Sequence, residues 1–141
     1  MTTLLFLDDD DAARAPLAAG LARMVAEDLD LDVDAYSAGM RPSHVRPEVR
    51  KLLREAGAAV DGIHAKPLLA VPLDEVTLAV KLAPDLRFPL PAGLPCIDWH
   101  LPDPTCAPLA DRDDAWRATR DELVRRLKLH LTPRGSSTRS G

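Results

Sequence analysis

Four consecutive aspartates and one arginine are the residues of this chain whose types and spacing best support chemistry. Asp8–Asp11 directly follow the apolar run Leu4–Leu7, and Arg14 lies three residues beyond the last aspartate. Clustered carboxylates can bind a divalent cation such as Mg²⁺, and with that cation a carboxylate can accept a phosphoryl group. A guanidinium beside them can instead act as the counter-ion of one carboxylate. The segment therefore suggests either a cation site or an ion-paired loop.

The remaining reactive side chains do not form a cluster by their spacing. Cys96 and Cys106 are too few for a disulfide framework and lack the spacing of a zinc site. We expect one buried thiol and one loop thiol, and a redox pair stays open because sequence does not give their distance. The histidines are scattered along the chain, and none is assigned to a site: His44, His64, His100 and His130.

Apolar periodicity predicts the elements that position these residues. Leu4–Leu7 is typical of a strand buried on both faces, and three further strands are expected at Leu31–Tyr36, Val76–Leu82 and Leu94–Trp99. Helices are expected from the spacing of Leu17, Leu21, Met24 and Val25, from Pro47 to a cap at Gly57, and over Asp111–Leu131. This order predicts an α/β domain with three layers: a four-stranded, mainly parallel sheet with helices on both faces. The Asp8–Arg14 loop falls at the carboxyl end of a strand, where such sheets place their working sites.

Length and composition narrow the function classes. The 141 residues fit one domain, residues 1–131, and a polar tail at 132–141 that we expect to be disordered. No apolar run could span a bilayer and no signal-peptide pattern is present, so we expect a cytoplasmic protein without membrane contact. The net charge of −4 argues against nucleic-acid binding.

The last predicted helix is rich in arginine. Its basic residues are Arg117, Arg120, Arg125 and Arg126, and we interpret them as a solvated face paired with Asp113, Asp114, Asp121 and Glu122 at helical spacing. A protein partner or a second copy of the chain could use this face.

Three segments, in this order and spacing, resemble low-molecular-weight protein tyrosine phosphatases and the thioredoxin-coupled arsenate reductases that share their fold. They are Leu5–Gly20, Tyr36–Lys66 and Trp99–Pro104, and the resemblance covers nearly the whole chain apart from the tail. It implies an active loop of the form Cys-x5-Arg directly after the first strand. In that loop a cysteine thiolate is the nucleophile, while backbone N–H groups and the arginine hold the oxyanion.

The loop of this chain departs from that pattern at most positions. Counting back from Arg14, Asp8 stands at the cysteine position. Asp10 stands where the family has glycine, Ala12 where it has the serine that bonds the thiolate, and Asp11 where it often has asparagine. Only Arg14 matches. The resemblance therefore implies a degenerate member that lacks the catalytic cysteine.

A second match lies late in the chain. Pro102-Asp103-Pro104 resembles the loop that carries the family's general acid, so Asp103 aligns with the proton donor to the leaving group. The alternative reading is that Asp103 braces a turn between two prolines. The arsenate reductases also use further cysteines late in the sheet, and Val80–Ala83 has none.

The charge of the loop opposes anion binding. Four carboxylates and one guanidinium leave it about three charges negative. A unit charge pair at 4 Å is worth ~1 kcal/mol in water and ~4 kcal/mol at an effective dielectric near 20. A phosphate dianion would be repelled there, so we expect no oxyanion binding.

Three functions follow. We favour a non-catalytic binding or regulatory module with an unidentified protein partner and no cofactor. Whether the chain forms a homodimer stays open.

Asp8-x-Asp10 also resembles the nucleophile motif of haloacid-dehalogenase-type phosphatases, and the strand ending in paired aspartates resembles receiver domains. That reading makes Asp8 the nucleophile, Asp10 the acid and Lys81 the phosphate lysine, with Mg²⁺ held among Asp8, Asp9, Asp10 and Asp11. The third reading is a residual phosphatase or arsenate reductase that uses Asp8 or Cys106.

Overall fold

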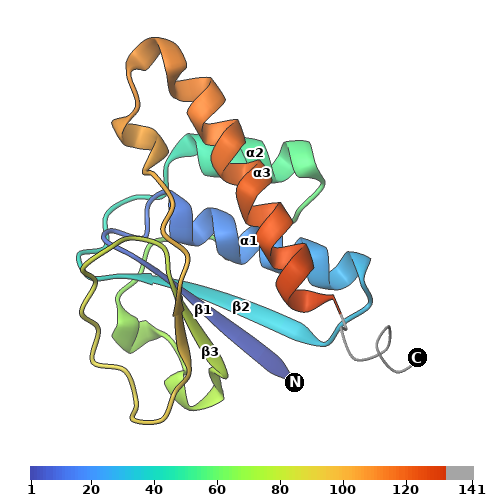
Figure 1. The fold of residues 1–141 in the computed structure, drawn as a ribbon, viewed down its shortest axis with the longest axis vertical. Coiled ribbons are helices and arrows are strands. Elements are labelled where there is room, and N and C mark those ends of the chain that lie inside the picture. Colours follow the sequence, from blue (N-terminus) through green and yellow to red (C-terminus); the bar gives the residue numbers. More distant parts are fainter. Residues whose placement is uncertain (133–141) are drawn as a thin grey trace.

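A four-stranded parallel sheet organises the part of the chain that the computed structural model describes, residues 1–132 (Figure 1). Its strands are β1 (Thr2–Asp8), β2 (Val33–Gly39), β3 (Leu78–Lys81) and β4 (Cys96–Asp98), in the order β2-β1-β3-β4. Every neighbouring pair is parallel. Since β1 has a strand on each side and covered faces, Thr3–Asp8 is buried throughout, as the apolar run predicted.

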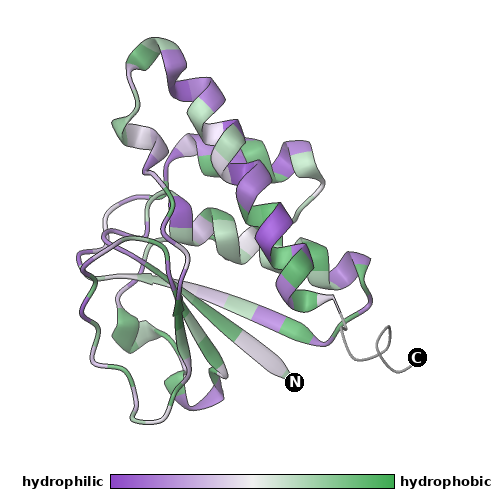
Figure 2. Ribbon diagram, in the orientation of Figure 1, coloured by the Kyte–Doolittle hydropathy of each residue, from purple (hydrophilic) through white to green (hydrophobic). Residues whose placement is uncertain are grey.

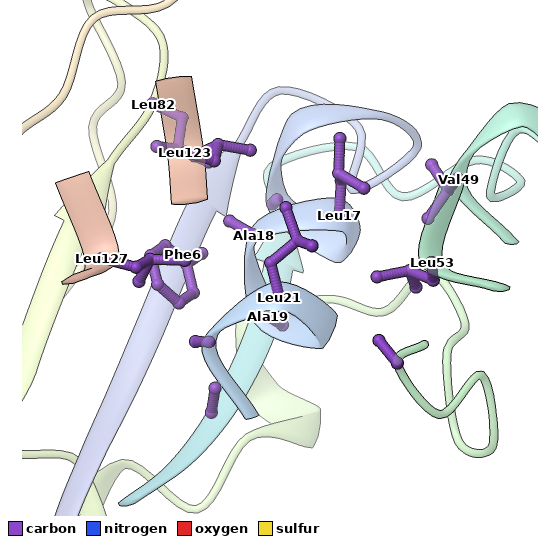
Figure 3. Packing of buried hydrophobic residues seen from close by; sticks show 14 of the residues in the cluster. Phe6, Leu17, Ala18, Ala19, Leu21, Val49, Leu53, Leu82, Leu123 and Leu127 are labelled. Carbon is purple, nitrogen blue, oxygen red and sulfur yellow. The ribbon is translucent and has the colours of Figure 1, made fainter. Parts of the chain in front are cut away.

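All three α-helices pack on one face of this sheet: α1 (Arg14–Asp28), α2 (Pro47–Ala56) and α3 (Arg112–Leu131). Side chains alternate along a strand, so Leu4 and Phe6 of β1 point toward these helices. Figure 3 shows side chains from β1, α1, α2 and α3 meeting in this common core, Phe6, Leu21 and Leu127 among them. The larger core of the molecule therefore lies between the sheet and the helices.

The opposite face is covered by short 3₁₀ helices and loops. Leu5 and Leu7 of β1 pack there against residues of η1 (Leu68–Ala70), the segment around η2 (Leu73–Glu75) and the proline-rich stretch that follows β3. The prolines of these segments lack the N–H that a longer helix needs. The predicted three-layer α/β fold is confirmed, and its thinner layer consists of 3₁₀ turns.

The boundaries of β2, β3 and β4 differ from those expected. β2 begins at Val33 and continues through Ser37-Ala38-Gly39, beyond the expected range Leu31–Tyr36. These residues pair in register with Phe6, Leu7 and Asp8 of β1. β3 and β4 are shorter than predicted, at four and three residues. Pairing with the neighbouring strand thus sets the strand lengths more than local sequence does.

The helices follow their sequence signals closely. Pro47 opens α2, and Gly57 caps it in the left-handed conformation with φ of 83°. In α3 one apolar face is buried, made by Trp116, Leu123, Leu127 and Leu131. Figure 2 shows this helix alternating between hydrophobic and hydrophilic residues.

The predicted disorder of 132–141 lies outside the described residues except at Thr132. Among the described helices, none combines the length and apolar character that crossing a bilayer requires.

Candidate functional site

The Asp8–Arg14 loop joins the carboxyl end of β1 to the first turn of α1. The segment after β2 holds its outer side through three hydrogen bonds: the N–H groups of Arg41, Ser43 and Arg46 donate to the carbonyls of Asp9, Asp10 and Ala12 at 2.8, 3.0 and 2.8 Å. These three hydrogen bonds hold the backbone of the loop in place.

Gly39 allows β2 to approach the loop closely. A Cβ atom at this position would lie 2.6 Å from the backbone nitrogen of Asp11 and 2.7 Å from the carbonyl carbon of Asp10. Real Cβ atoms do not come this close to backbone, so any other residue would displace the loop. The Ser-Ala-Gly motif therefore helps to shape the loop.

The carboxylate of Asp8 accepts five hydrogen bonds from the loop and from the first turn of α1. Asp8 is 1% exposed, and its Oδ1 accepts from the backbone N–H of Asp9 at 2.8 Å and from Arg14 Nη2 at 2.7 Å. Its Oδ2 accepts from the backbone N–H groups of Arg14 and Ala15 at 3.1 and 3.4 Å, and from Arg14 Nε at 3.3 Å. The N–H groups at the start of a helix and a guanidinium make an anion site, and here the anion is the chain's own side chain.

Arg14 is buried and lies among three carboxylates. It is 5% exposed, and its Nη1 donates to the carbonyl of Leu101 at 2.9 Å. Besides the close pair with Asp8, its Nη2 lies 3.8 Å from a carboxylate oxygen of Asp9 and 3.9 Å from one of Asp103. One guanidinium thus faces three negative charges, and the cluster stays negative overall.

Asp10 lies at the mouth of the loop. Its Oδ1 accepts from the backbone N–H of Ala12 at 3.3 Å, and burial, followed by the charge of Asp8, raises the pKa of its carboxyl. A cavity of about 330 Å³ opens beside it, lined by Asp9, Asp10, Met40 and Arg41. The opening of the loop therefore carries two carboxylates.

Asp11 points away from this mouth and into the protein. It is fully buried and adopts a left-handed φ of 51°, a conformation that aspartate and asparagine accept more readily than most residues. Its Oδ2 accepts from the backbone N–H of Lys66 at 3.0 Å and lies 3.7 Å from Lys66 Nζ, while its Oδ1 has no hydrogen-bond partner among residues 1–132. Burial raises the pKa of Asp11 to about 6, against the opposing effects of Ser37 and Lys66.

The four aspartates do not converge on one point. Asp8 faces Arg14, Asp11 faces Lys66, and the side chain of Asp9 is largely exposed. Within residues 1–132 no group of three or more His, Cys, Asp or Glu side chains could hold a metal ion. Lys81 ends β3 level with Leu7 and forms no ion pair with these aspartates in the described part of the chain. Backbone and guanidinium donors direct these carboxylates to different partners, and the cation site at Asp8–Asp11 stays a prediction.

Asp103, the residue at the acid-loop match, lies near the loop. It precedes η3 (Pro104–Cys106), and its Oδ1 accepts from both the N–H and the hydroxyl of Thr105 at 2.9 and 2.7 Å. Its Oδ2 is the oxygen 3.9 Å from Arg14. The side chain therefore braces a turn with one oxygen and faces the loop with the other.

The cysteine prediction was wrong in one respect. Both Cys96 and Cys106 are exposed free thiols, because β4 is an edge strand and η3 lies at the surface. Cys106 lines the cavity that also contains Asp103.

None of the histidines belongs to the loop. His130 is exposed with its ring edge-on to Trp99, and His64 bonds the carbonyl of Gly62. His100 lies 4.0 Å from Asp98.

Sequence reasoning missed two features. The first is the contact of Lys66 with Asp11, which joins residues 55 positions apart and has no local signal. The second is Glu55 of α2, which pairs with Arg117 and Arg120 of α3 at 3.1 and 3.5 Å. Arg125 and Arg126 pair within α3 with Glu122, as helical spacing predicted.

Comparison with known proteins agrees with this architecture. The family model described as low molecular weight phosphotyrosine protein phosphatase matches residues 3–87. An arsenate reductase in the phosphate binding state is similar at 21% identity and a TM-score of 0.76, over 91% of this chain and 95% of that one. A low molecular weight protein tyrosine phosphatase from Bacillus subtilis is similar at 20% identity and a TM-score of 0.71, over 90% of this chain and 93% of that one.

An arsenate reductase from Archaeoglobus fulgidus gives 22% identity and a TM-score of 0.69, over 88% of this chain and 98% of that one. No curated protein matches significantly. At these identities the structural neighbours establish the fold, while the family model covers more than half of the chain. The chain belongs to the low molecular weight phosphotyrosine protein phosphatase family.

Proposed function

We propose that this protein is a catalytically inactive member of its family that acts as a binding or regulatory module toward a protein partner. The observation that carries the proposal is the carboxylate of Asp8, which stands at the nucleophile position and is bound by five donors of its own loop. The Arg14 side chain and the backbone N–H groups of Asp9, Arg14 and Ala15 are thereby already used within the chain.

Asp8 is a poor nucleophile in this setting. Both of its oxygens accept hydrogen bonds, and the side chain is buried against Arg14. To attack a phosphorus or arsenic atom, the carboxylate would have to leave these donors and approach a second anion. No cation among the described residues other than Arg14 is paired with Asp8 to offset that repulsion.

The guanidinium that would bind an oxyanion is also engaged within the chain. Arg14 Nη1 donates to Leu101, while Nε and Nη2 donate to Asp8. Asp9 and Asp103 lie within 4 Å of the same guanidinium. Asp103 could donate a proton only to a leaving group that another residue had displaced, and Asp8 does not provide that step.

The test is an aryl phosphate hydrolysis assay, run with and without Mg²⁺, beside an arsenate reduction assay with a thiol donor. We expect no turnover above the rate of the Asp8→Asn variant in any of them. Mg²⁺-dependent hydrolysis that disappears in Asp8→Asn would overturn the proposal in favour of metal-dependent phosphoryl transfer. Arsenate reduction that is lost in Cys106→Ser would overturn it in favour of a reductase.

A further inference from the structure

A large apolar cavity lies beside the loop, on the other side of Asp103. It has a volume of about 630 Å³ and is bounded by the segment around η3 and by the first half of α3. Its apolar walls are made by Leu101, Pro102, Pro104, Ala107, Ala115 and Ala118. Cavities of roughly 300–1,000 Å³ with mostly apolar walls and a few polar groups are typical of small-molecule sites.

The charges of this cavity are all of one sign. Asp103 and Glu122 line it, and no Lys, Arg or His of residues 1–132 does so. Glu122 is already neutralised, because Arg125 and Arg126 approach it at 2.7 and 2.6 Å. Thr119 also lines the cavity, but its hydroxyl donates to the carbonyl of Ala115.

Asp103 is the carboxylate that lacks full compensation. Its nearest cation is Arg14 at 3.9 Å, and that guanidinium is held at 2.7 Å by Asp8 and is also 3.8 Å from Asp9. The charge of Asp103 further raises the pKa of Asp10, which places a fourth carboxylate in the same electrostatic neighbourhood. A positive charge at this end of the cavity would relieve repulsion among several anions.

We propose that this cavity binds a small organic cation: an aryl or alkyl body that packs between the η3 segment and α3, attached to an ammonium group that pairs with Asp103. Such a ligand fits both features of the cavity, its apolar walls and the incompletely compensated charge of Asp103. The preference is opposite in sign to that of a pocket for aryl phosphates. The site goes beyond the proposed function and does not require Asp8 to be inert.

The two cysteines allow a direct measurement. Cys106 lines the cavity, whereas Cys96 is exposed on β4 outside it, and they are the only two thiols of the chain. The rate at which iodoacetamide alkylates each thiol is followed by mass spectrometry. The probes are phenethylammonium, its neutral analogue 2-phenylethanol and the anionic phenyl phosphate. Phenethylammonium should slow the alkylation of Cys106 and leave that of Cys96 unchanged.

The order of the probes tests the charge argument. The neutral alcohol should need at least about fivefold higher concentration for the same protection, which is the factor that one charge pair at 4 Å contributes in water. Phenyl phosphate should protect least. Equal protection by all three probes, or no protection by phenethylammonium up to its solubility, would overturn the proposal.

Matched variants separate the charge from the cavity. Asp103→Asn keeps an oxygen that can accept from Thr105 and removes the charge. It should raise the concentration of phenethylammonium needed to protect Cys106 by at least about fivefold and leave that of 2-phenylethanol unchanged. Asp74→Asn, an exposed carboxylate of η2 outside the cavity, makes the same change in net charge and should have no effect. Ala118→Phe, at an exposed position of α3, should fill the cavity and abolish protection by both probes.

The outcomes that would overturn the cation site differ from those that would overturn the proposed function. Hydrolysis of phenyl phosphate would overturn the inactive module and leave cation protection of Cys106 in place. An Asp103→Asn variant that binds phenethylammonium as well as the wild type would overturn the cation site, whatever the outcome of the hydrolysis assay.

Discussion

At the scale of single residues, the substitution at the nucleophile position changes more than reactivity. A thiolate places one negatively charged atom at the start of the helix, and an anionic substrate then occupies the loop. The carboxylate of Asp8 carries two oxygens, and between them they accept from Asp9, Arg14 and Ala15. Asp8 thus stands at the nucleophile position, and its carboxylate also occupies the place of a bound anion.

Removal of the Asp8 carboxylate should reopen the anion site. Asp8→Ala leaves Arg14 buried without its close partner, a change that typically costs about 3–5 kcal/mol. Phosphate should then bind in place of the carboxylate and restore stability, by ~2.7 kcal/mol at a concentration about 100 times its dissociation constant. Thermal melts with and without phosphate measure both effects.

The matched control for this variant is Asp9→Ala, whose side chain is largely exposed and 3.8 Å from Arg14. It should be nearly as stable as the wild type and gain nothing from phosphate. If phosphate stabilises the wild type as much as Asp8→Ala, the Asp8 carboxylate does not occupy the site.

Asp11 gives a pH-dependent prediction. Its pKa is raised from the ordinary value of 3.8 to about 6, so the folded state binds a proton more tightly than the unfolded state does. The stability from this proton is fully present below about pH 3.8 and is lost as the pH rises through about 6. Asp11→Asn accepts the same φ and has no charge to bury, and it should raise stability above pH 6 by up to about 3 kcal/mol.

The measurement for Asp11 is the difference in unfolding free energy between Asp11→Asn and the wild type across pH 4–8. The advantage of the variant should grow between about pH 4 and pH 6 and then stay level. A constant difference across the range would mean that the buried carboxylate does not titrate in this way.

At the scale of elements, the contact between β2 and the loop depends on Gly39. Gly39→Ala would place a Cβ against the backbone of Asp10 and Asp11, which cannot move without breaking the loop's hydrogen bonds. We expect a loss of about 1–3 kcal/mol in denaturant unfolding. Gly20→Ala in α1 is the comparison: its Cβ meets only the flexible side chain of Leu53, and alanine favours the helix.

The loss in Gly20→Ala should therefore be the smaller of the two. A Gly39→Ala variant that is no less stable than Gly20→Ala would show that the loop backbone adapts freely.

Helix α3 is bound to the core through one face. Leu127→Ala removes a fully buried side chain and should cost about 2–5 kcal/mol in denaturant unfolding. Leu129→Ala, two residues away on the exposed side, should change the stability by less than about 0.5 kcal/mol. Similar losses in both variants would contradict the observed orientation of α3.

At the scale of the whole molecule, we do not expect the net charge of −4 to give specific binding of divalent cations. The loop carboxylates face different partners, so a thermal melt titrated with Mg²⁺, Mn²⁺ or phosphate should show no shift. A ligand at about 100 times its dissociation constant would add ~2.7 kcal/mol, which a melt detects easily. A rise with a metal alone would mean that the aspartates rearrange into a cation site.

The sequence alone determined the features that depend on neighbouring residues. The apolar run before Asp8, the spacing from Asp8 to Arg14, and the Pro47 and Gly57 signals of α2 all follow from local pattern and backbone preference. The same holds for the buried face of α3, because helical periodicity places its apolar residues on one side. These features were sufficient to predict the fold class.

Only the tertiary structure decided how the charges are distributed. Which aspartate holds Arg14, the burial of Asp11 against Lys66 and the approach of Asp103 all join segments that are distant in sequence. The length of β2 likewise depends on its pairing with β1. A run of four aspartates has no local signal that distinguishes its members. Their separate roles arise because the backbone turn at Asp11 directs one side chain inward, while the start of α1 and Arg14 capture another.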